Sequence, residues 1–218
     1  MQAELGFNGA SGNSSFSILR TGLRAVHLET GVAEFEASGL LRYGRSDGKV
    51  IADDRKASVK LDVWPETRLS PFAFADASAD EIRRLDVRFS GGAGAKWTFW
   101  TGGSGKASVS AAALYDYQNF SEAVSSAAAP SESLARWSVR SKLERKLTAT
   151  ASFEHVAFWQ PVWDDAGDYL LDVTHSLSTR LQSRFTLALE HQFLRDASPP
   201  PGVGPSDQRF SVVLKMAF

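Results

Sequence analysis

Acidic and basic residues recur at alternate positions along most of this chain, a spacing that suits one charged face of β-strands. Both signs are interspersed on that face, which favours cross-strand ion pairs, whereas a ring of one sign would select ions. If the strands close into a barrel with this face inside, ion pairs cross-link the wall of the lumen. The charged residues predicted to face the lumen are Arg20, Arg24, Glu34, Glu36, Arg42, Lys56, Lys60, Asp62, Asp86, Arg88, Arg136, Arg140, Lys142, Glu144, Glu154, Asp172, Arg184, Glu190, Arg209 and Lys215.

Serine and histidine are the residues whose spacing could support hydrolysis. A Ser-His dyad needs the nucleophile and the base within hydrogen-bond reach. Ser152 lies on the opposite strand face from His155, and Ser176 lies on the opposite face from His175. The sequence therefore predicts that the protein is not an enzyme and has no catalytic residue, and a membrane-bound hydrolase is the least favoured alternative.

Metal binding would need several ligands to converge. Pairing that follows the short turns places His175 near Phe185 and His191 near Tyr169, so the histidines are expected to lie apart. Asp164–Asp168 gathers carboxylates that hard cations accept, but it lacks the spacing of the helical calcium loop. A solvated acidic loop is favoured, and whether this loop binds a cation stays open. The chain has no Cys and therefore no Cys-based metal site, and no metal site or cofactor is predicted.

The length of 218 residues is within the range of one large all-β domain, and the chain is predicted to form a single domain, residues 1–218. The formal net charge of -1 produces no field that would attract nucleic acid. No run of about 18 apolar residues exists that could form a transmembrane helix. Met1–Glu4 reads like the start of a mature secreted chain with an added start codon.

Apolar and polar residues alternate in twelve successive runs, and helical periodicity is nearly absent. Only the fifth run is apolar on both faces, so its register stays open. The runs cover about residues 2–12, 19–27, 33–43, 56–63, 68–77, 85–100, 107–117, 136–144, 149–154, 169–177, 184–193 and 209–218.

The last run is apolar at alternate positions up to the final residue. Such an ending suits a strand that closes a barrel and faces lipid, and it resembles the signal by which outer-membrane barrels are recognised for assembly. The residues of this predicted assembly signal are Phe210, Val212, Leu214, Met216 and Phe218.

Aromatic residues cluster at the ends of the runs, as in the two interfacial girdles of a membrane barrel. Short and long connections also alternate, and an even strand count places both termini on the periplasmic side. A soluble β-sandwich is the alternative fold. The predicted girdle comprises Tyr43, Trp64, Trp97, Trp100, Tyr115, Tyr117, Trp159 and Tyr169.

Three segments carry a resemblance to a known family: Glu4–Ser14, Asp86–Gly94 and Pro199–Val203. Together they resemble the domain-of-unknown-function 481 family of salt-induced outer-membrane barrels of Gram-negative bacteria, over essentially the whole chain. The Trp97–Trp100 stretch and the Ser/Ala-rich segment match least. The resemblance implies a fold and a location, but no reaction and no catalytic residues.

These observations predict a closed, antiparallel, up-and-down transmembrane β-barrel of about twelve strands in the bacterial outer membrane. Its largely plugged lumen favours a structural or interaction protein of the cell envelope, and a narrow passive channel for small solutes is the alternative. The expected partners are outer-membrane lipids, the barrel assembly machinery, and envelope proteins that contact loops 119–133 and 196–208.

Overall fold

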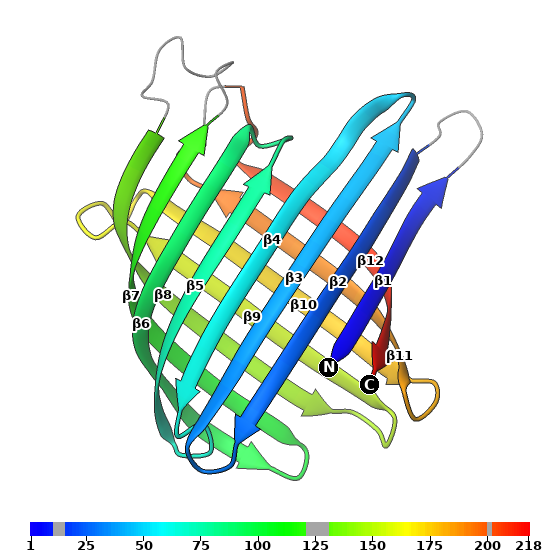
Figure 1. Ribbon diagram of the computed structural model, residues 1–218, viewed down its shortest axis with the longest axis vertical. Coiled ribbons are helices and arrows are strands. Elements are labelled where there is room, and N and C mark those ends of the chain that lie inside the picture. Colours follow the sequence, from blue (N-terminus) through cyan, green and yellow to red (C-terminus); the bar gives the residue numbers. More distant parts are fainter. Residues whose placement is uncertain (11–15, 121–130, 200–201) are drawn as a thin grey trace.

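The computed structural model describes residues 1–10, 16–120, 131–199 and 202–218 (Figure 1). Every strand pairs antiparallel with its neighbours along the chain, and β1 pairs with β12, so the sheet closes into a twelve-stranded barrel. This confirms the predicted fold class. The described residues include no helix long and apolar enough to span a membrane. The strands are β1 (Gln2–Ala10), β2 (Phe16–Glu29), β3 (Ala33–Ser46), β4 (Lys49–Val63), β5 (Leu69–Asp80), β6 (Leu85–Gly102), β7 (Gly105–Phe120), β8 (Ser131–Lys146), β9 (Ala151–Pro161), β10 (Tyr169–Arg180), β11 (Phe185–Asp196) and β12 (Ser206–Ala217).

Both chain ends lie at one end of the barrel, here called the turn end (Figure 1). Five short connections also lie there, and the strand ends joined by the two longest connections, β7 to β8 and β11 to β12, lie at the opposite loop end. This asymmetry agrees with the sequence. The tenth run, expected to end at residue 177, was placed too short, because β10 continues to Arg180 and the turn is residues 181–184.

The β3–β4 connection is shorter than the sequence suggested. Asp47 and Gly48 have φ angles of 47° and 80°, which are the two positive values of a type I′ hairpin turn. The turn therefore takes only two residues, and β4 begins at Lys49 rather than near Lys56. The seven added residues bring Asp54 onto the inner face, opposite Arg42.

The register of β5 is settled by its pairing with β4. Phe74 lies opposite Lys60, and Phe72 lies opposite Asp62, so both aromatic rings are on the inner face. The Lys60 ammonium stands 5.2 Å from the centre of the Phe72 ring. Apolar rings therefore share the barrel interior with charged groups.

The outer face carries large apolar side chains at alternate positions. Phe35 is 46% exposed, Leu61 is 42% exposed, and Leu214 is 40% exposed. Fully buried residues, in contrast, include Asp116 and Ser70. A protein with its polar groups inside and its apolar groups outside is arranged for lipid rather than for water.

Candidate functional site: the lumen and its ion pairs

An ion-pair network crosses the lumen near the loop end. Arg209 on β12 lies 3.3 Å from Asp80 on β5 and 4.0 Å from Asp54 on β4. Arg42 on β3 donates its Nε–H to the same Asp54 carboxylate at 2.6 Å. Because β12 and β5 are separated by four strands one way round the wall and six the other, this contact bridges the interior.

A second contact crosses the lumen beside the first. Arg83, in the β5–β6 connection, lies 3.4 Å from Asp207 at the start of β12. The Arg83 backbone N–H also donates to Asp80 at 3.1 Å, so the connection is fixed to the network. Two arginines thus join opposite walls at the loop end.

The wall formed by β2, β1, β12 and β11 carries a chain of alternating charges. Arg20 contacts Glu4 at 2.9 Å and Glu190 at 2.6 Å, and Glu190 contacts Lys215 at 2.7 Å. A Cβ atom at Gly22 would lie only 2.7 Å from the Glu4 carboxylate. Glycine at this position therefore leaves the room that Glu4 needs to reach Arg20.

Asp116 on β7 is fully buried and forms the centre of a third cluster. Arg88 contacts it at 2.7 Å, Ser90 donates a hydroxyl at 2.7 Å, and Arg136 lies 3.6 Å away. Arg136 also donates to the Asp168 carboxylate at 3.3 Å. Asp168, the last carboxylate of the Asp164–Asp168 loop, is thereby joined to the inner wall.

Two further ion pairs join neighbouring strands of a hairpin. Arg24 forms a bidentate contact with Glu36, at 2.6 and 2.7 Å. Lys142 lies 3.3 Å from Glu154 and also pairs with Glu144 on its own strand. Short turns fix both registers, so both contacts follow from the sequence.

Lysines surround one buried carboxylate toward the turn end. Asp62 is 3% exposed and lies 2.6 Å from Lys60 and 3.5 Å from Lys96. Lys56 makes a longer contact with Asp76, at 3.9 Å. The inner wall here holds both signs, as along the rest of the network.

Three further predicted residues have other inner neighbours. The Arg140 guanidinium stands 5.1 Å from the centre of the Phe158 ring. Asp172 accepts from the Gln192 amide at 3.1 Å. Glu34 lies directly opposite Asp62, so its nearest cross-strand neighbour has the same charge.

Two predicted lumen residues lie elsewhere. Arg184 is exposed in the turn before β11, because that strand begins only at Phe185. Asp86 is exposed at a register shift between Leu85 and Val87, which interrupts the alternation of β6. Both predictions assumed an unbroken strand pattern through these positions.

Several residues of the network were missed by the sequence reasoning. Asp54 and Asp80 share the inner face with Lys56 and Asp76, and the alternation would have found them if the strands had been extended. Lys96 likewise continues the alternation of β6. The fourth run was begun too late to include Asp54, the fifth was ended too early to include Asp80, and Lys96 lay within the sixth run but was not counted among the charged residues of the lumen.

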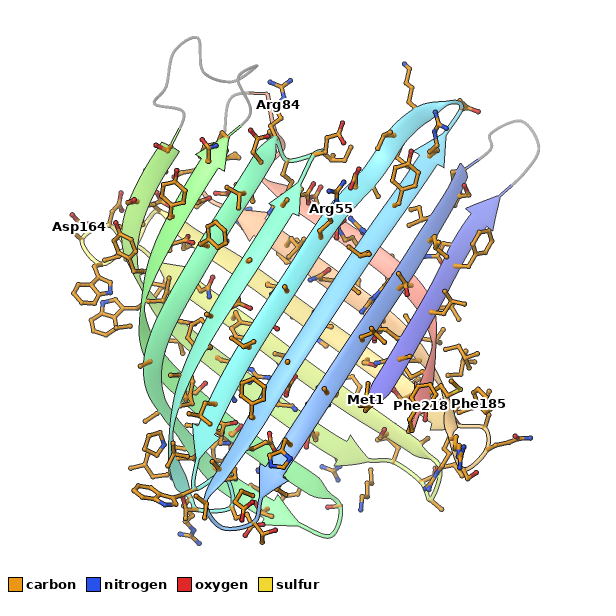
Figure 2. All side chains as sticks on the ribbon, viewed as in Figure 1. Met1, Arg55, Arg84, Asp164, Phe185 and Phe218 are labelled. Atoms are coloured by element: carbon orange, nitrogen blue, oxygen red, sulfur yellow. The ribbon has the colours of Figure 1, made fainter. Side chains whose placement is uncertain are left out.

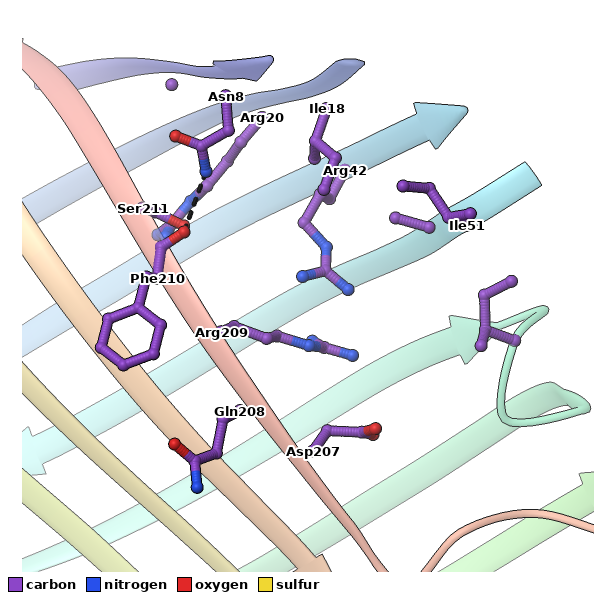
Figure 3. A pocket seen from close by; sticks show the side chains of 13 residues that line it. Asn8, Ile18, Arg20, Arg42, Ile51, Asp207, Gln208, Arg209, Phe210 and Ser211 are labelled. Carbon is purple, nitrogen blue, oxygen red and sulfur yellow. Dashed lines mark hydrogen bonds between the residues drawn. The ribbon is translucent and has the colours of Figure 1, made fainter. Parts of the chain in front are cut away.

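Two cavities lie inside the loop-end half of the barrel. The larger has a volume of about 270 Å³ and is lined by residues that include Arg20, Arg42 and Arg209 (Figure 3). The smaller, about 100 Å³, shares these three arginines and adds Asp54 and Glu190. The spaces in the network are therefore of solute size and are surrounded by charge.

The sequence predicted that the histidines lie apart, but three of them lie side by side on the outer face. His175 on β10 lies directly opposite His155 on β9 and His191 on β11, with ring centroids 4.9 and 5.8 Å away. The row continues to Phe210 on β12, 4.5 Å from His191. Ser176 faces the lumen and so lies on the other side of the wall from this row. Among the described residues, no group of His, Cys, Asp or Glu could hold a metal ion.

Aromatic residues gather at both ends of the strands. Trp137 and Trp163 at the loop end, which the sequence reasoning did not include, stack with ring centroids 4.8 Å apart. At the turn end lie Trp64, Trp97 and Trp100, and toward the loop end lie Tyr43, Tyr115, Tyr117, Trp159 and Tyr169.

Apart from the buried Val213, the final strand keeps its large apolar side chains on the outer face. Phe210 and Phe218 are each 69% exposed, and the Phe218 backbone N–H donates to the Met1 carbonyl at 3.1 Å. Figure 2 shows Met1 and Phe218 close together at the turn end. The last residue is therefore ordered against the first and presents its ring outward.

A family model described as "Protein of unknown function, DUF481" matches residues 3–218. No curated protein matches the chain. In fold, the chain is similar to a NanC porin structure, with 9% identity, a TM-score of 0.62 and 100% of each chain covered. It is also similar to a KdgM porin, with 6% identity, a TM-score of 0.55 and coverage of 100% of this chain and 99% of that one. The COG4313 outer membrane channel from Pseudomonas putida F1 shares 11% identity at a TM-score of 0.57, with coverage of 100% and 94%.

These structures share the barrel fold with this chain. Together with the closed twelve-stranded sheet and its apolar outer face, this fold places the protein in the bacterial outer membrane as an integral barrel.

Proposed function

The chain belongs to the DUF481 family, and from that premise we propose that this outer-membrane barrel is closed across its lumen and acts as a structural or interaction protein of the cell envelope. The observation that carries the proposal is the contact between Arg209 and Asp80, which joins opposite walls. The Arg83–Asp207 contact supports it at the same level. Inward aromatic rings such as Phe72 reduce the free space further.

A narrow passive channel for small solutes is the second candidate. The two loop-end cavities and the mixed charge of the wall favour it, as does the likeness in fold to proteins named as porins. Single-channel recording of the unmodified protein in a planar lipid bilayer separates the two. A closed lumen gives rare or very small conductance steps, whereas large, stable, weakly selective steps would establish the channel.

The partners follow from the same proposal. Outer-membrane lipids cover the outer face, and the assembly machinery reads the outward residues of β12. Envelope proteins contact the loop end through segments 119–133 and 196–208, of which residues 121–130 and 200–201 lie outside the described chain. The described part of the second segment is joined to the β5–β6 connection by Asp207.

Orientation in the membrane is part of the proposal, with the turn end facing the periplasm. The chain has no Cys, so a single introduced thiol reports its side without background. A thiol at Asp164→Cys should react with an impermeant reagent added to intact cells, and one at Gly31→Cys should not. The reverse pattern would invert the orientation.

A further inference from the structure

The ladder that closes the barrel is short. Between β1 and β12, the pairs run only from Gln2 opposite Ala217 to Gly6 opposite Val213. On their other edges, β1 continues to pair with β2 through Ala10, and β12 pairs with β11 from Ser206. In the described chain, no ladder pair joins residues 7–10 to residues 206–212. We call this unpaired stretch the seam.

One side-chain contact crosses the seam. The Asn8 amide donates to the backbone carbonyl of Phe210 at 2.9 Å, as Figure 3 shows. Below it, a Cβ atom on Gly6 would lie 3.2 Å from the Val212 carbonyl, so the two strands are close there. The seam therefore begins above Gly6 and extends toward the loop end.

The larger cavity lies at the seam. Its lining combines inner residues, such as Arg209 and Ser211, with Gln208 and Phe210, which belong to the outer face of the same strand (Figure 3). The unbroken run Asp207–Ser211 therefore borders the cavity, on the strand that lacks ladder partners beside Asn8. The cavity thus lies directly against the seam.

Three arginines, Arg20, Arg42 and Arg209, line this cavity. Among the described lining residues the one carboxylate is Asp207, which is paired with Arg83, and the carboxylates that pair with the three arginines stand outside the lining. Arg20 has contacts of 2.6 and 2.9 Å to its partners, whereas the contacts of Arg209 are 3.3 and 4.0 Å. Arg209 is therefore the guanidinium that can most readily exchange a carboxylate for another anion.

Apolar side chains border the cavity at the seam, and the cavity is small. Ile18 and Ile51 line the cavity, and the Phe210 ring is exposed on the lipid side. At about 270 Å³, the cavity lies below the usual volume of a pocket that encloses a whole drug-sized ligand. Unpaired strand edges in a membrane also need polar partners. A small polar head group with an apolar chain left outside meets all of these conditions.

We propose that the seam between β1 and β12 is a lateral entrance through which the head group of an amphiphilic anion, dissolved in the membrane, enters the cavity and binds Arg209. Its acyl chain stays between Phe210 and the surrounding lipid. The entrance lies in the wall and not along the barrel axis, but it shares Arg209 with the contact that closes the lumen in the proposed function. Photolabelling reports on the entrance and conductance reports on the closure, so the two can fail separately. A β-strand of another protein added to the open edges is the competing occupant.

The test uses the whole barrel in liposomes that contain laurate with a diazirine beside its carboxylate. After irradiation, mass spectrometry locates the adducts. We expect them to concentrate on the seam residues Gln208 and Phe210 and on Ile18, which lines the cavity beside the seam. Arg209→Gln should reduce these adducts by about tenfold, as for loss of a charge-assisted contact. Lys56→Gln removes one inner positive charge away from the seam and should leave them unchanged.

A closed seam provides a control that uses one folded protein. In the double variant Phe7→Cys and Val212→Cys, the two thiols occupy the position that would follow the last ladder pair. Because the native chain has no Cys, oxidation forms a single bond, which should abolish the seam adducts, and reduction should restore them.

Three results would overturn the proposal. The first is equal labelling by the diazirine laurate methyl ester, which lacks the negative charge. The second is competition by butyrate as effective as competition by laurate, which would mean that the anion comes from water. The third is a cross-linked second chain at the seam in place of laurate adducts, which would identify a strand as the occupant.

Discussion

The guanidinium of Arg209 on β12 lies 3.3 Å from the carboxylate of Asp80 on β5, although 129 residues separate the two along the chain. The two side chains are 20% and 12% exposed, so the contact is largely shielded from water. An ion pair in this setting is costly to break by removing one partner, because the other charge is left buried.

Arg209→Gln should therefore raise the axial conductance of the barrel above that of the unmodified protein. The barrel should also lose about 1–3 kcal/mol of stability, because Asp80 loses a charged partner. Planar-bilayer recording and urea titration in detergent measure the two effects. Lys56→Gln removes the same charge without a cross-lumen contact, and an equal rise in conductance there would attribute the effect to net charge alone.

The coupling between the two residues can be measured separately. In a double-mutant cycle with Asp80→Asn, the combined variant should cost less stability than the sum of the two single variants. Each single variant leaves one charged residue without its partner, whereas in the double variant both residues are neutral. Additive costs would mean that the contact contributes nothing to stability.

Glu36→Ala should change conductance more than Glu34→Ala. Glu36 pairs with Arg24, whereas Glu34 faces Asp62, so only the first substitution frees a guanidinium to move in the lumen. The Arg24 side chain is 48% exposed, and we expect a stability cost of only about 0–1 kcal/mol. Equal responses of the two variants in single-channel recordings would contradict this assignment.

Leu189→Arg should destabilise the barrel by about 2–4 kcal/mol, the cost of a basic side chain at the middle of the bilayer. Leu189 is 53% exposed on the outer face, midway along β11, with Leu177 and Val212 opposite it. The same change at Leu69, beside Trp97 at the turn end, should cost about 0–1 kcal/mol. Reversible unfolding in liposomes gives both values, and similar costs at the two sites would argue against a lipid-facing band.

Deletion of Phe218 should impair assembly in cells more than folding into detergent micelles. The Phe218 ring is exposed, so its loss removes little packing, while the terminal position resembles a recognition signal. Phe7→Ala is a matched control, since Phe7 is 64% exposed on the first strand. The measurements are the amount of barrel in outer-membrane fractions and the folded fraction in detergent. Equal losses in both would mean that Phe218 contributes only packing contacts.

Local features of this barrel follow from the sequence. Alternation predicts the strands and their faces, and a short turn is enough to bring Arg24 to Glu36. The contact between Arg209 and Asp80 could not be predicted in this way, because it depends on how far opposite walls approach after the sheet has closed.

The histidine row shows a different limit. The turn between β10 and β11 lies at residues 181–184, later than expected, and this moves the partner of His175 from Phe185 to His191. Because a turn sets every pair in its hairpin, a small displacement of this turn changed the cross-strand partner of every residue in the β10–β11 hairpin. The assignment of residues to the inner and outer faces stayed correct, so the alternation itself did not reveal the error in register.

The short ladder between β1 and β12 has a consequence for the order of folding. Its five pairs join the first residues of the chain to the last, whereas the other ladders join neighbouring strands. Closing a loop of this length costs about 5 kcal/mol of chain entropy if nothing else is ordered. Hairpins that form first bring the two ends together and reduce that cost. We therefore expect closure to be the final event of folding and this junction to be the first to separate when the barrel unfolds.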